Sequence, residues 1–392
     1  MRREKDCLFP LLVFLCAFLL MWYRAPGRIE RGFLWAEDAV IFIAQARELG
    51  IGSFIRTYAG YWHFVPRLVA WLQMKSTPIE KAPYFFAWSC ALITAGSSAY
   101  MACAFRHFSR PVAALLALAP LLVPQTGEVL LNITNIQWIL FPTLIVLLWE
   151  NLFDPPESWY GVRSLAVAAI ALTGPFGIIA FGPAVLAAIY ACRRGPLSRR
   201  QIGFLVAYVA GVAGQVYAIA TNGSPTLDFG ASPSVWNYGA RMIRDLFCDL
   251  LPSPDGAPLV GGLILAVALV FVTARSRAVW ACLLLAPMAL IIWLLGSART
   301  NPEGMDMAWY GFGARYVYPA LLFSFWAALL SAATTTSKLS RILAGALVMV
   351  ILLASATRFS VSEWPMWEVT RESAGYTLKV APNWTAQIPD TR

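Results

Sequence analysis

The sequence has few charged residues and almost no histidine. Asp, Glu, Lys and Arg make up 13% of the 392 residues and 59% are hydrophobic, whereas a soluble globular domain carries about 25% charged residues. This deficit excludes an ordinary soluble domain and indicates lipid as the solvent for most of the chain. Because His63 and His107 are the only histidines, a histidine metal centre is not expected.

Paired cysteines, repeats and linkers are also absent from the sequence. The 7 cysteines are scattered within or beside apolar segments without metal or redox spacing, so we expect no disulfide framework. No repeat of fixed period and no low-complexity linker divides the chain. We therefore expect one transmembrane bundle over residues 1–357, including an outer loop at 24–82, and a short outward tail at 358–392.

The net charge of +9 does not indicate a nucleic-acid partner. Lys and Arg occur in short runs between apolar segments rather than along one basic face. The basic start and apolar middle of residues 2–22 are typical of a signal peptide, but no small-residue cleavage site follows them. We expect this stretch to be retained as a first span.

Long apolar runs dominate the sequence. A helix needs about 20 apolar residues to cross a hydrocarbon core of about 30 Å, and eleven windows bounded by charge, Gly or Pro approach this length. They lie at residues 8–23, 83–105, 111–124, 130–149, 159–173, 176–191, 203–220, 257–274, 278–296, 314–332 and 342–357. The predicted fold class is an all-α, polytopic membrane bundle of about eleven transmembrane helices, with interfacial helices in the first outer loop.

The basic residues predict the orientation of these helices, because cytoplasmic loops carry the excess of Lys and Arg. Alternate loops hold Arg2, Arg3 and Lys5, then Arg106 and Arg110, Arg193 to Arg200, Arg275 and Arg277, and Lys338 and Arg341. We expect these loops and the N-terminus to be cytoplasmic. The segments 24–82, 221–256 and 297–313 and the C-terminal tail should face outward.

A Thr-Gly-Pro-Phe-Gly sequence at 173–177 interrupts the apolar run 159–191. One long kinked span is an alternative, but it would place the arginines of 193–200 outside, against the charge rule. We therefore predict two short helices that meet at this turn. A helix of fifteen residues reaches only about 22 Å, so we expect a recessed turn that lines a cavity.

The first outer segment, 24–82, is too rich in aromatic and apolar residues for a solvated loop, so we expect it to lie on the membrane. Within it, Glu37 and Asp38 place adjacent carboxylates directly after the first span. Two interpretations stay open. Acidic residues in a first turn cap a helix and offset its dipole, whereas a carboxylate among aromatic side chains can have a raised pKa and take a proton from a hydroxyl.

A second pattern in this segment combines aromatic rings with an imidazole and a guanidinium, at Tyr58, Tyr61, His63 and Arg67. Aromatic faces can stack on a sugar ring, and an arginine can bind a phosphate through two hydrogen bonds. The alternative is an interfacial aromatic anchor whose arginine extends to water.

Polar side chains gather at the outer end of the fourth predicted span, where a lipid-facing helix would have none. They are Asn132, Asn135 and Gln137, followed by Trp138. Such groups usually face the interior of a bundle. They are either substrate contacts or interhelical hydrogen bonds.

Arg315 and Tyr316 open the tenth predicted span. An arginine at this place either extends to the membrane interface or holds a lipid-linked phosphate against the membrane surface.

Together these features resemble the membrane-embedded glycosyltransferases of the GT-C superfamily, which use polyprenyl-phosphate sugars as donors. The resemblance rests on the short N-terminus, the large first outer loop with its acidic motif, the multispan bundle and the outward tail, and it covers nearly the whole chain. The motifs Trp35-Ala-Glu-Asp, Tyr58-Ala-Gly-Tyr with Pro66-Arg67, Asn132-Ile-Thr-Asn-Ile-Gln-Trp and Arg315-Tyr-Val-Tyr-Pro are also similar to those of bacterial membrane proteins of this type.

The resemblance implies an inverting transfer of a hexose or pentose to a glycan or lipid acceptor, on the outer face of the bacterial inner membrane. The superfamily's base carries over to Asp38 or Glu37. A helix beginning near Glu37 would turn Asp38 inward and leave Glu37 to cap the first turn, which favours Asp38. Some members use a divalent cation, for which Glu128, Glu303 and Asp306 are loose candidates here.

Two other classes of protein compete with this enzyme. A transporter or flippase of lipid-linked sugars would need alternating access and often has broken helices in matched positions, and one such break is visible. A purely structural membrane subunit would leave the clustered outward polar groups unexplained.

Overall fold

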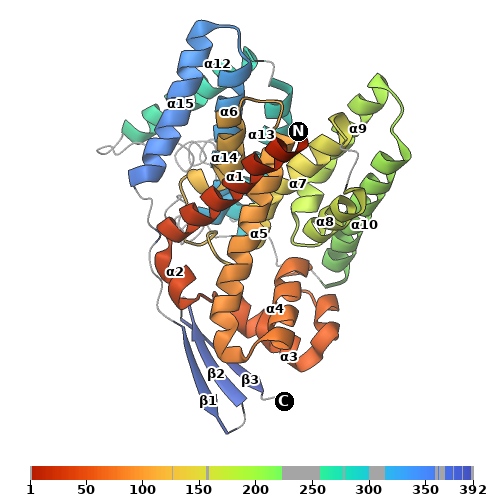
Figure 1. Cartoon of the computed structure of the whole chain (residues 1–392), viewed down its shortest axis with the longest axis vertical. Coiled ribbons are helices and arrows are strands. Elements are labelled where there is room, and N and C mark those ends of the chain that lie inside the picture. The colour runs from red at the N-terminus through yellow and green to blue at the C-terminus, as the bar shows by residue number, and fades with distance from the viewer. Residues whose placement is uncertain are drawn as a thin grey trace. The chain divides into compact units, whose positions relative to one another are not determined.

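The computed structural model describes residues 2–125, 127–155, 159–222, 257–276, 279–299, 314–357, 361, 367–373, 375–381 and 383–389. Most of these residues are helical (Figure 1). The chain divides into two compact units, each made of separated stretches. The first comprises Met1–Val13, Ala99–Glu128 and Thr226–Val361, and the second comprises Phe14–Ser98, Val129–Pro225 and Ser362–Arg392.

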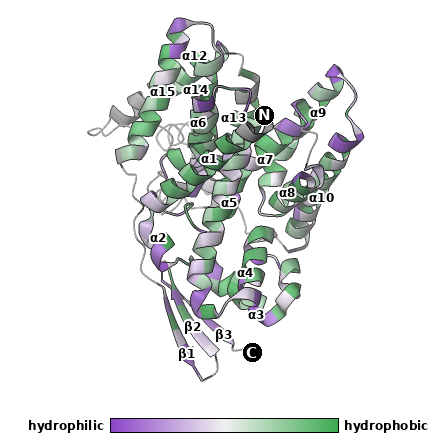
Figure 2. Cartoon of the chain, viewed as in Figure 1, coloured by the Kyte–Doolittle hydropathy of each residue, from purple (hydrophilic) through white to green (hydrophobic). Residues whose placement is uncertain are grey.

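Within the described residues, 7 helical segments are long and apolar enough to cross a membrane, which indicates a membrane protein. They are Cys7–Arg24, Ile79–Ala104, Ile136–Phe153, Phe176–Arg194, Arg199–Asn222, Arg315–Thr334 and Lys338–Ala356. Figure 2 shows apolar residues along α9 (Phe176–Arg194) and α10 (Arg199–Asn222) and polar residues where these two helices meet. The predicted, mostly helical architecture is confirmed, and the count of about eleven spans stays a prediction.

The first unit is organised around α14 (Ala314–Thr334). This helix packs on α6 (Arg110–Leu122), α12 (Ala257–Ala274), α13 (Val279–Arg299) and α15 (Lys338–Thr357). The Trp326 indole donates a hydrogen bond of 2.9 Å to the carbonyl oxygen of Leu116. Pro120, four residues later, has no N–H to donate to that carbonyl, so the indole satisfies a buried acceptor that α6 leaves open.

The second unit combines the first outer segment with four longer helices. The outer segment forms α2 (Pro26–Arg31), the π-helix η1 (Asp38–Ile43), α3 (Ala44–Leu49), the 3-10 helix η2 (Gly50–Ile55), α4 (Phe64–Ser76) and the 3-10 helix η3 (Ile79–Lys81). The longer helices are α7 (Ile136–Phe153), α8 (Tyr160–Ala171), α9 and α10. Both α1 (Arg2–Arg24) and α5 (Ala82–Ala104) have residues in each unit.

The break at 173–177 confirms the prediction of two helices. Helix α8 ends at Ala171 and α9 begins at Phe176. Gly174 has a φ of +90°, a backbone conformation that favours glycine. A cavity at this turn stays a prediction.

The start of α7 differs from the prediction of a span from residue 130. Residues 127–135 form turns, and the helix begins at Ile136. Asn132 and Asn135 therefore precede the helix instead of lying within it. Short polar side chains such as those of Asn and Thr bond to nearby backbone groups and so favour turns over helix interiors.

The C-terminal tail forms a sheet that the all-α prediction omits. Strands β1 (Glu368–Glu372), β2 (Gly375–Val380) and β3 (Trp384–Pro389) pair antiparallel in the order β1-β2-β3. The apolar side chains of β2 and β3 alternate with polar ones and are buried, at Tyr376, Leu378, Val380, Ala386 and Ile388. This period of two is the usual sequence signal of a half-buried strand.

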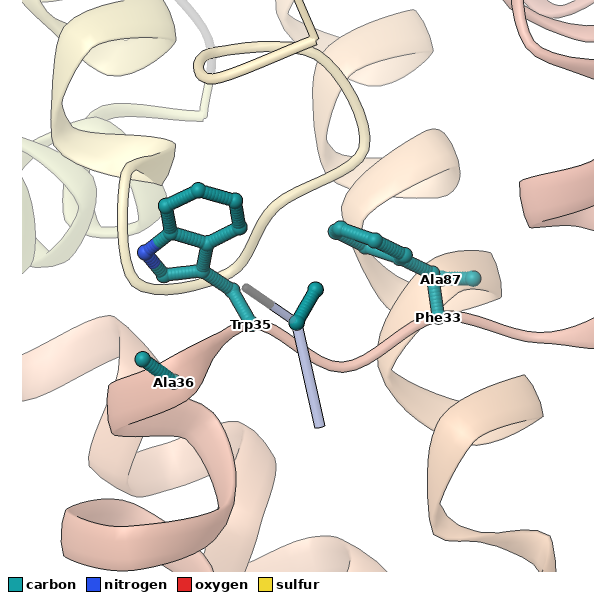
Figure 3. Close-up of a cluster of buried hydrophobic side chains, with 5 residues drawn as sticks. Phe33, Trp35, Ala36 and Ala87 are labelled. Atoms are coloured by element: carbon teal, nitrogen blue, oxygen red, sulfur yellow. The ribbon is translucent and has the colours of Figure 1, made fainter. Parts of the chain in front are cut away.

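This sheet packs against the first outer segment. Trp35 forms a parallel bridge with Ala381, and β3 contacts both η1 and α3. Figure 3 shows Phe33, Trp35, Ala36 and Ala87, which together with Ala381 form a buried apolar cluster. The last strands of the chain therefore support the backbone that leads into the acidic pair.

Candidate functional site

Asp38 is the first residue of η1 and is fully buried, with 1% of its surface exposed. One carboxylate oxygen, Oδ2, accepts a hydrogen bond of 2.9 Å from the backbone N–H of Trp35. The other, Oδ1, accepts bonds from the N–H and the hydroxyl of Thr134, at 3.0 and 2.7 Å. The Asp38 carboxylate thus joins the outer segment to the turn that precedes α7.

Burial determines the protonation of Asp38. Loss of hydration raises the pKa of this carboxyl to about 7, and the neighbouring Glu37 charge acts in the same direction. The hydrogen bonds from Trp35 and Thr134 oppose this rise because they stabilise the charged form. Asp38 therefore changes its charge close to neutral pH.

Glu37 differs from Asp38 in its exposure and its bonds. It is half-buried, and its Oε1 accepts a hydrogen bond of 3.1 Å from the Tyr58 hydroxyl. Its Oε2 is buried and has no hydrogen-bond partner in the described part of the chain. Glu37 forms no side-chain cap on η1, so the expectation that it caps a first turn is wrong. Glu37 Oε1 accepts its hydrogen bond from the Tyr58 hydroxyl and not from a backbone N–H of the helix.

Four rings, one from η1 and three from the loop between η2 and α4, form an aromatic cluster beside Glu37. They belong to Phe42, Tyr58, Tyr61 and His63, which we call the aromatic cluster. The His63 ring lies 4.6 Å from that of Tyr61, 5.4 Å from that of Phe42 and 5.7 Å from that of Tyr58, between centroids. The predicted aromatic and imidazole residues are thus brought together around a buried histidine.

A tight turn places two of these tyrosines on the cluster. The backbone N–H and carbonyl of Tyr58 pair with those of Tyr61, at 3.0 and 3.2 Å. Ala59 and Gly60, between them, have φ values of 53° and 84°. Two consecutive positive φ angles are typical of the narrow turns that reverse a chain within two residues.

Arg67, on α4, is buried beside this cluster with 1% exposure. Its Nη1 donates a hydrogen bond of 2.8 Å to Gln45 Oε1, and its guanidinium carbon lies 5.5 Å from the centre of the Phe42 ring. Nε and Nη2 have no hydrogen-bond partner within the described residues. Burial lowers the pKa of Arg67 to about 10, and the nearby Arg56 charge contributes. The buried guanidinium contradicts the alternative of an arginine that extends to water.

The residues around the start of α7 contact different neighbours. Asn135 donates its N–H to the Asn132 side-chain oxygen at 3.4 Å, within the turn that Asp38 holds. Gln137 packs on the α8–α9 turn, because a Cβ added at Gly174 would overlap its Oε1. Trp138 meets Phe176, at the start of α9, edge to face with centroids 4.7 Å apart. All four predicted residues are buried.

Arg315 and Tyr316 belong to the first unit, whereas the acidic pair belongs to the second. The Arg315 side chain forms an ion pair with Glu128, and its backbone N–H donates to Glu128 Oε2 at 3.3 Å. The Tyr316 ring packs where Gly296 leaves room for it. Arg315 is therefore neutralised by a carboxylate of its own unit.

The candidate metal ligands do not assemble in the part of the chain that the structure describes. No group of three or more His, Cys, Asp or Glu side chains there is arranged to hold a metal ion. Glu128 is paired with Arg315, and Glu303 and Asp306 lie outside the described residues. Metal dependence therefore stays an open prediction.

Sequence reasoning missed three polar residues that hold this region together: Gln45, Thr134 and Gln215. Thr134 bonds Asp38 and Gln45 bonds Arg67. Gln215, in the apolar helix α10, bonds the backbone of Trp62. A lone buried glutamine in an apolar helix is a readable signal, because such groups need partners, although the sequence does not say which.

The chain was compared with protein-family models, curated proteins and solved structures, and none of them matches it.

Proposed function

We propose that this protein is a membrane glycosyltransferase of the GT-C type, which moves a sugar from a polyprenyl-phosphate donor to an acceptor hydroxyl. One observation carries the proposal: two unmet hydrogen-bonding demands flank the aromatic cluster. Among the described residues, Glu37 Oε2 has no donor, and Arg67 Nε and Nη2 have no acceptor. Buried polar atoms are almost always paired, so these atoms call for a ligand that offers a hydroxyl and an anion.

Side-chain contacts connect Glu37 to Arg67. Tyr58 bonds Glu37 and its ring lies 6.4 Å from that of Phe42, the ring over which the Arg67 guanidinium lies. An acceptor hydroxyl at Glu37 and a donor phosphate at Arg67 would thus contact one continuous group of side chains. The aromatic faces between them suit a sugar ring.

The reaction requires a base and a means of stabilising the leaving group. The acceptor oxygen attacks the anomeric carbon, the bond from that carbon to the phosphate oxygen breaks, and the configuration is inverted. The hydroxyl proton passes to the carboxylate, and the polyprenyl phosphate leaves with the bonding electron pair. Arg67 donates hydrogen bonds to the departing phosphate, which needs no proton from the protein.

Glu37 is the better base of the acidic pair, in contrast to the preference from the sequence. Asp38 already accepts three hydrogen bonds, so an acceptor hydroxyl would have to displace one of them. Glu37 Oε2 has no hydrogen-bond partner in the part of the chain that the structure describes. We assign proton transfer to Glu37 and assign Asp38 to positioning the turn at 132–135.

The outer face of a bacterial inner membrane is the location that we propose for this reaction. The excess of Lys and Arg in the opposite set of loops carries this location, and the bridge between Trp35 and Ala381 requires that both residues lie on one side of the membrane. The chain must then cross the membrane an even number of times between the two residues. The ten spans predicted between them meet this requirement. Reporter tags after Arg106, Arg200 and Lys338 should be cytoplasmic, and tags at Gly223 and after Arg392 outside.

Transfer by the purified chain tests the proposal. In nanodiscs, the protein should convert a labelled polyprenyl-phosphate sugar and an acceptor into product, and Glu37→Gln should not. The competing function is a flippase, for which the helix break at 173–177 is the supporting observation. Movement of the labelled lipid across vesicles without product would replace the transferase with that function.

A further inference from the structure

Gln215 is fully buried in α10 and binds the backbone of a single residue of the outer segment. Its Nε2 donates to the Trp62 carbonyl at 2.8 Å, and its Oε1 accepts from the Trp62 N–H at 3.0 Å. The preceding residue, Gly214, leaves space for the Trp62 indole, because a Cβ there would come within 2.8 Å of the ring. Helix α10 therefore binds Trp62 both through hydrogen bonds to its backbone and through the space that Gly214 leaves for its ring.

The α8–α9 turn holds the residues that follow. The Phe64 N–H donates to the Leu172 carbonyl and the Val65 N–H to the Thr173 hydroxyl, each at 3.1 Å. The Gly174 N–H donates to the Trp62 carbonyl at 2.9 Å. The helix break thus frees the backbone groups of Leu172 and Gly174, which an unbroken helix would use internally, and the Thr173 hydroxyl accepts a further bond.

This arrangement fixes the main chain between the two halves of the candidate site. Residues 58–61 form the turn of the aromatic cluster, and α4 carries Arg67, whose N–H bonds the His63 carbonyl at 3.1 Å. Residues 62–65 connect them and are bonded by Gln215 and the α8–α9 turn. A shift of this connection would move the tyrosines and Arg67 relative to Glu37.

We propose that Gln215, together with the α8–α9 turn at 172–174, is a positioning element that clamps residues 62–65 and thereby sets the geometry of the site. The clamp itself is independent of the reaction, and its effect on transfer rests on the proposed function. The side-chain amide suits this role because it offers one donor and one acceptor to the two backbone groups of Trp62.

Gln201 provides a matched control on the same helix. It is also a buried glutamine, and its Nε2 donates to the Asn151 carbonyl at 2.9 Å. At 1.5 Å per residue it lies about 21 Å from Gln215 along α10. Gln201→Leu and Gln215→Leu thus remove comparable groups, and only the second removes a bond to the outer segment.

Hydrogen–deuterium exchange of the full chain in nanodiscs tests the clamp. Gln215→Leu should raise the exchange rate of the Trp62 amide and its neighbours about ten-fold, because the opening of residues 62–65 becomes easier. Gln201→Leu should leave these amides unchanged. Equal exchange in the Gln215→Leu and wild-type proteins would overturn the clamp.

A second variant and a kinetic measurement complete the test. If Gln215→Leu does not fold, Thr173→Val removes only the hydroxyl that Val65 bonds and should raise exchange at Val65. In transfer assays Gln215→Leu should lower kcat more than it raises KM for the donor, and Gln215→Glu, at a pH where the buried carboxyl is protonated, should restore activity. Unchanged exchange refutes the clamp, whereas faster exchange in a chain without transferase activity refutes only the proposed function.

Discussion

Each unit of this protein contains a carboxylate and an arginine at a predicted binding region, and the two pairs are arranged differently. In the first unit, Glu128 and Arg315 neutralise each other directly. In the second, Glu37 bonds Tyr58 and Arg67 bonds Gln45. Within the described residues, one buried oxygen of Glu37 and two buried nitrogens of Arg67 have no hydrogen-bond partner. Charges that pair internally hold a fold together, whereas charges with unmet bonds are available to a ligand.

The largest expected effect contrasts the two carboxylates. Glu37→Gln should lower the transfer rate about 100- to 10,000-fold with little loss of stability, because it removes the base. Glu128→Gln should lower stability by about 1–2 kcal/mol, because it leaves the partly exposed Arg315 without its counter-charge. Turnover per folded molecule and thermal unfolding measure both. Near wild-type turnover in Glu37→Gln would make the acidic pair structural.

The two arginines give the second contrast. Arg67→Lys should raise the donor KM about 10- to 150-fold, because a lysine cannot replace hydrogen bonds to a charged group worth about 1.5–3 kcal/mol. Arg315→Lys should change turnover little, because a lysine can still pair with Glu128. If Arg315 instead held the lipid-linked phosphate, which is one of the two interpretations of the sequence, Arg315→Lys would lower activity. Donor titrations of both variants, with folded fractions measured in parallel, decide between these expectations.

Asp38 should make the stability of the second unit depend on pH. Its pKa in the folded protein, about 7, exceeds its unfolded value of about 3.9. Stability from the protonated form is therefore complete below about pH 4 and is lost as the pH rises towards 7, by at most about 1.4 kcal/mol per pH unit. Asp38→Asn should flatten this part of the curve of unfolding temperature against pH, and an unchanged slope would contradict the assignment.

The smallest expected effect concerns the Tyr58 hydroxyl. Tyr58→Phe removes one hydrogen bond to Glu37 and keeps the ring, so the transfer rate should fall about two- to ten-fold. Tyr61→Phe is the control, because the described contact of Tyr61 with the cluster is its ring. Equal losses in both variants would indicate that the rings, and not the bond to Glu37, matter.

Local sequence patterns predicted the helical windows, the break at 173–177 and the grouping of Tyr58 to Arg67 with the acidic pair. The helical windows follow from the length of the apolar runs, and the break follows from the backbone preferences of Gly and Pro. The grouping involves residues that are close in the sequence. The bond between Asp38 and Thr134 joins residues 96 positions apart, and that between Glu128 and Arg315 joins residues 187 apart. One sequence does not reveal such pairs, so it misplaces the start of α7 and does not identify Glu128 as the partner of Arg315.

The C-terminal sheet was missed although its pattern was readable. Residues 376, 378 and 380 alternate apolar with polar neighbours, which predicts a strand. The segment follows the last apolar run and is short, so the sequence also suits a simple tail. The burial of the sheet against the first outer segment depends on tertiary contacts, which the β-strand propensity of single residues does not predict.

The bridge between Trp35 and Ala381 also has a consequence for the order of biosynthesis. Chains are made from the N-terminus, so the outer segment is synthesised long before the strand that supports it. Glu37 and Asp38 are therefore without the bridge from Trp35 to Ala381 while the later helices are synthesised and inserted. A chain that stops before Ala381 would carry every residue of the candidate site and still lack the bridge that supports the backbone before Glu37, which would couple the proposed activity to synthesis of the C-terminal segment.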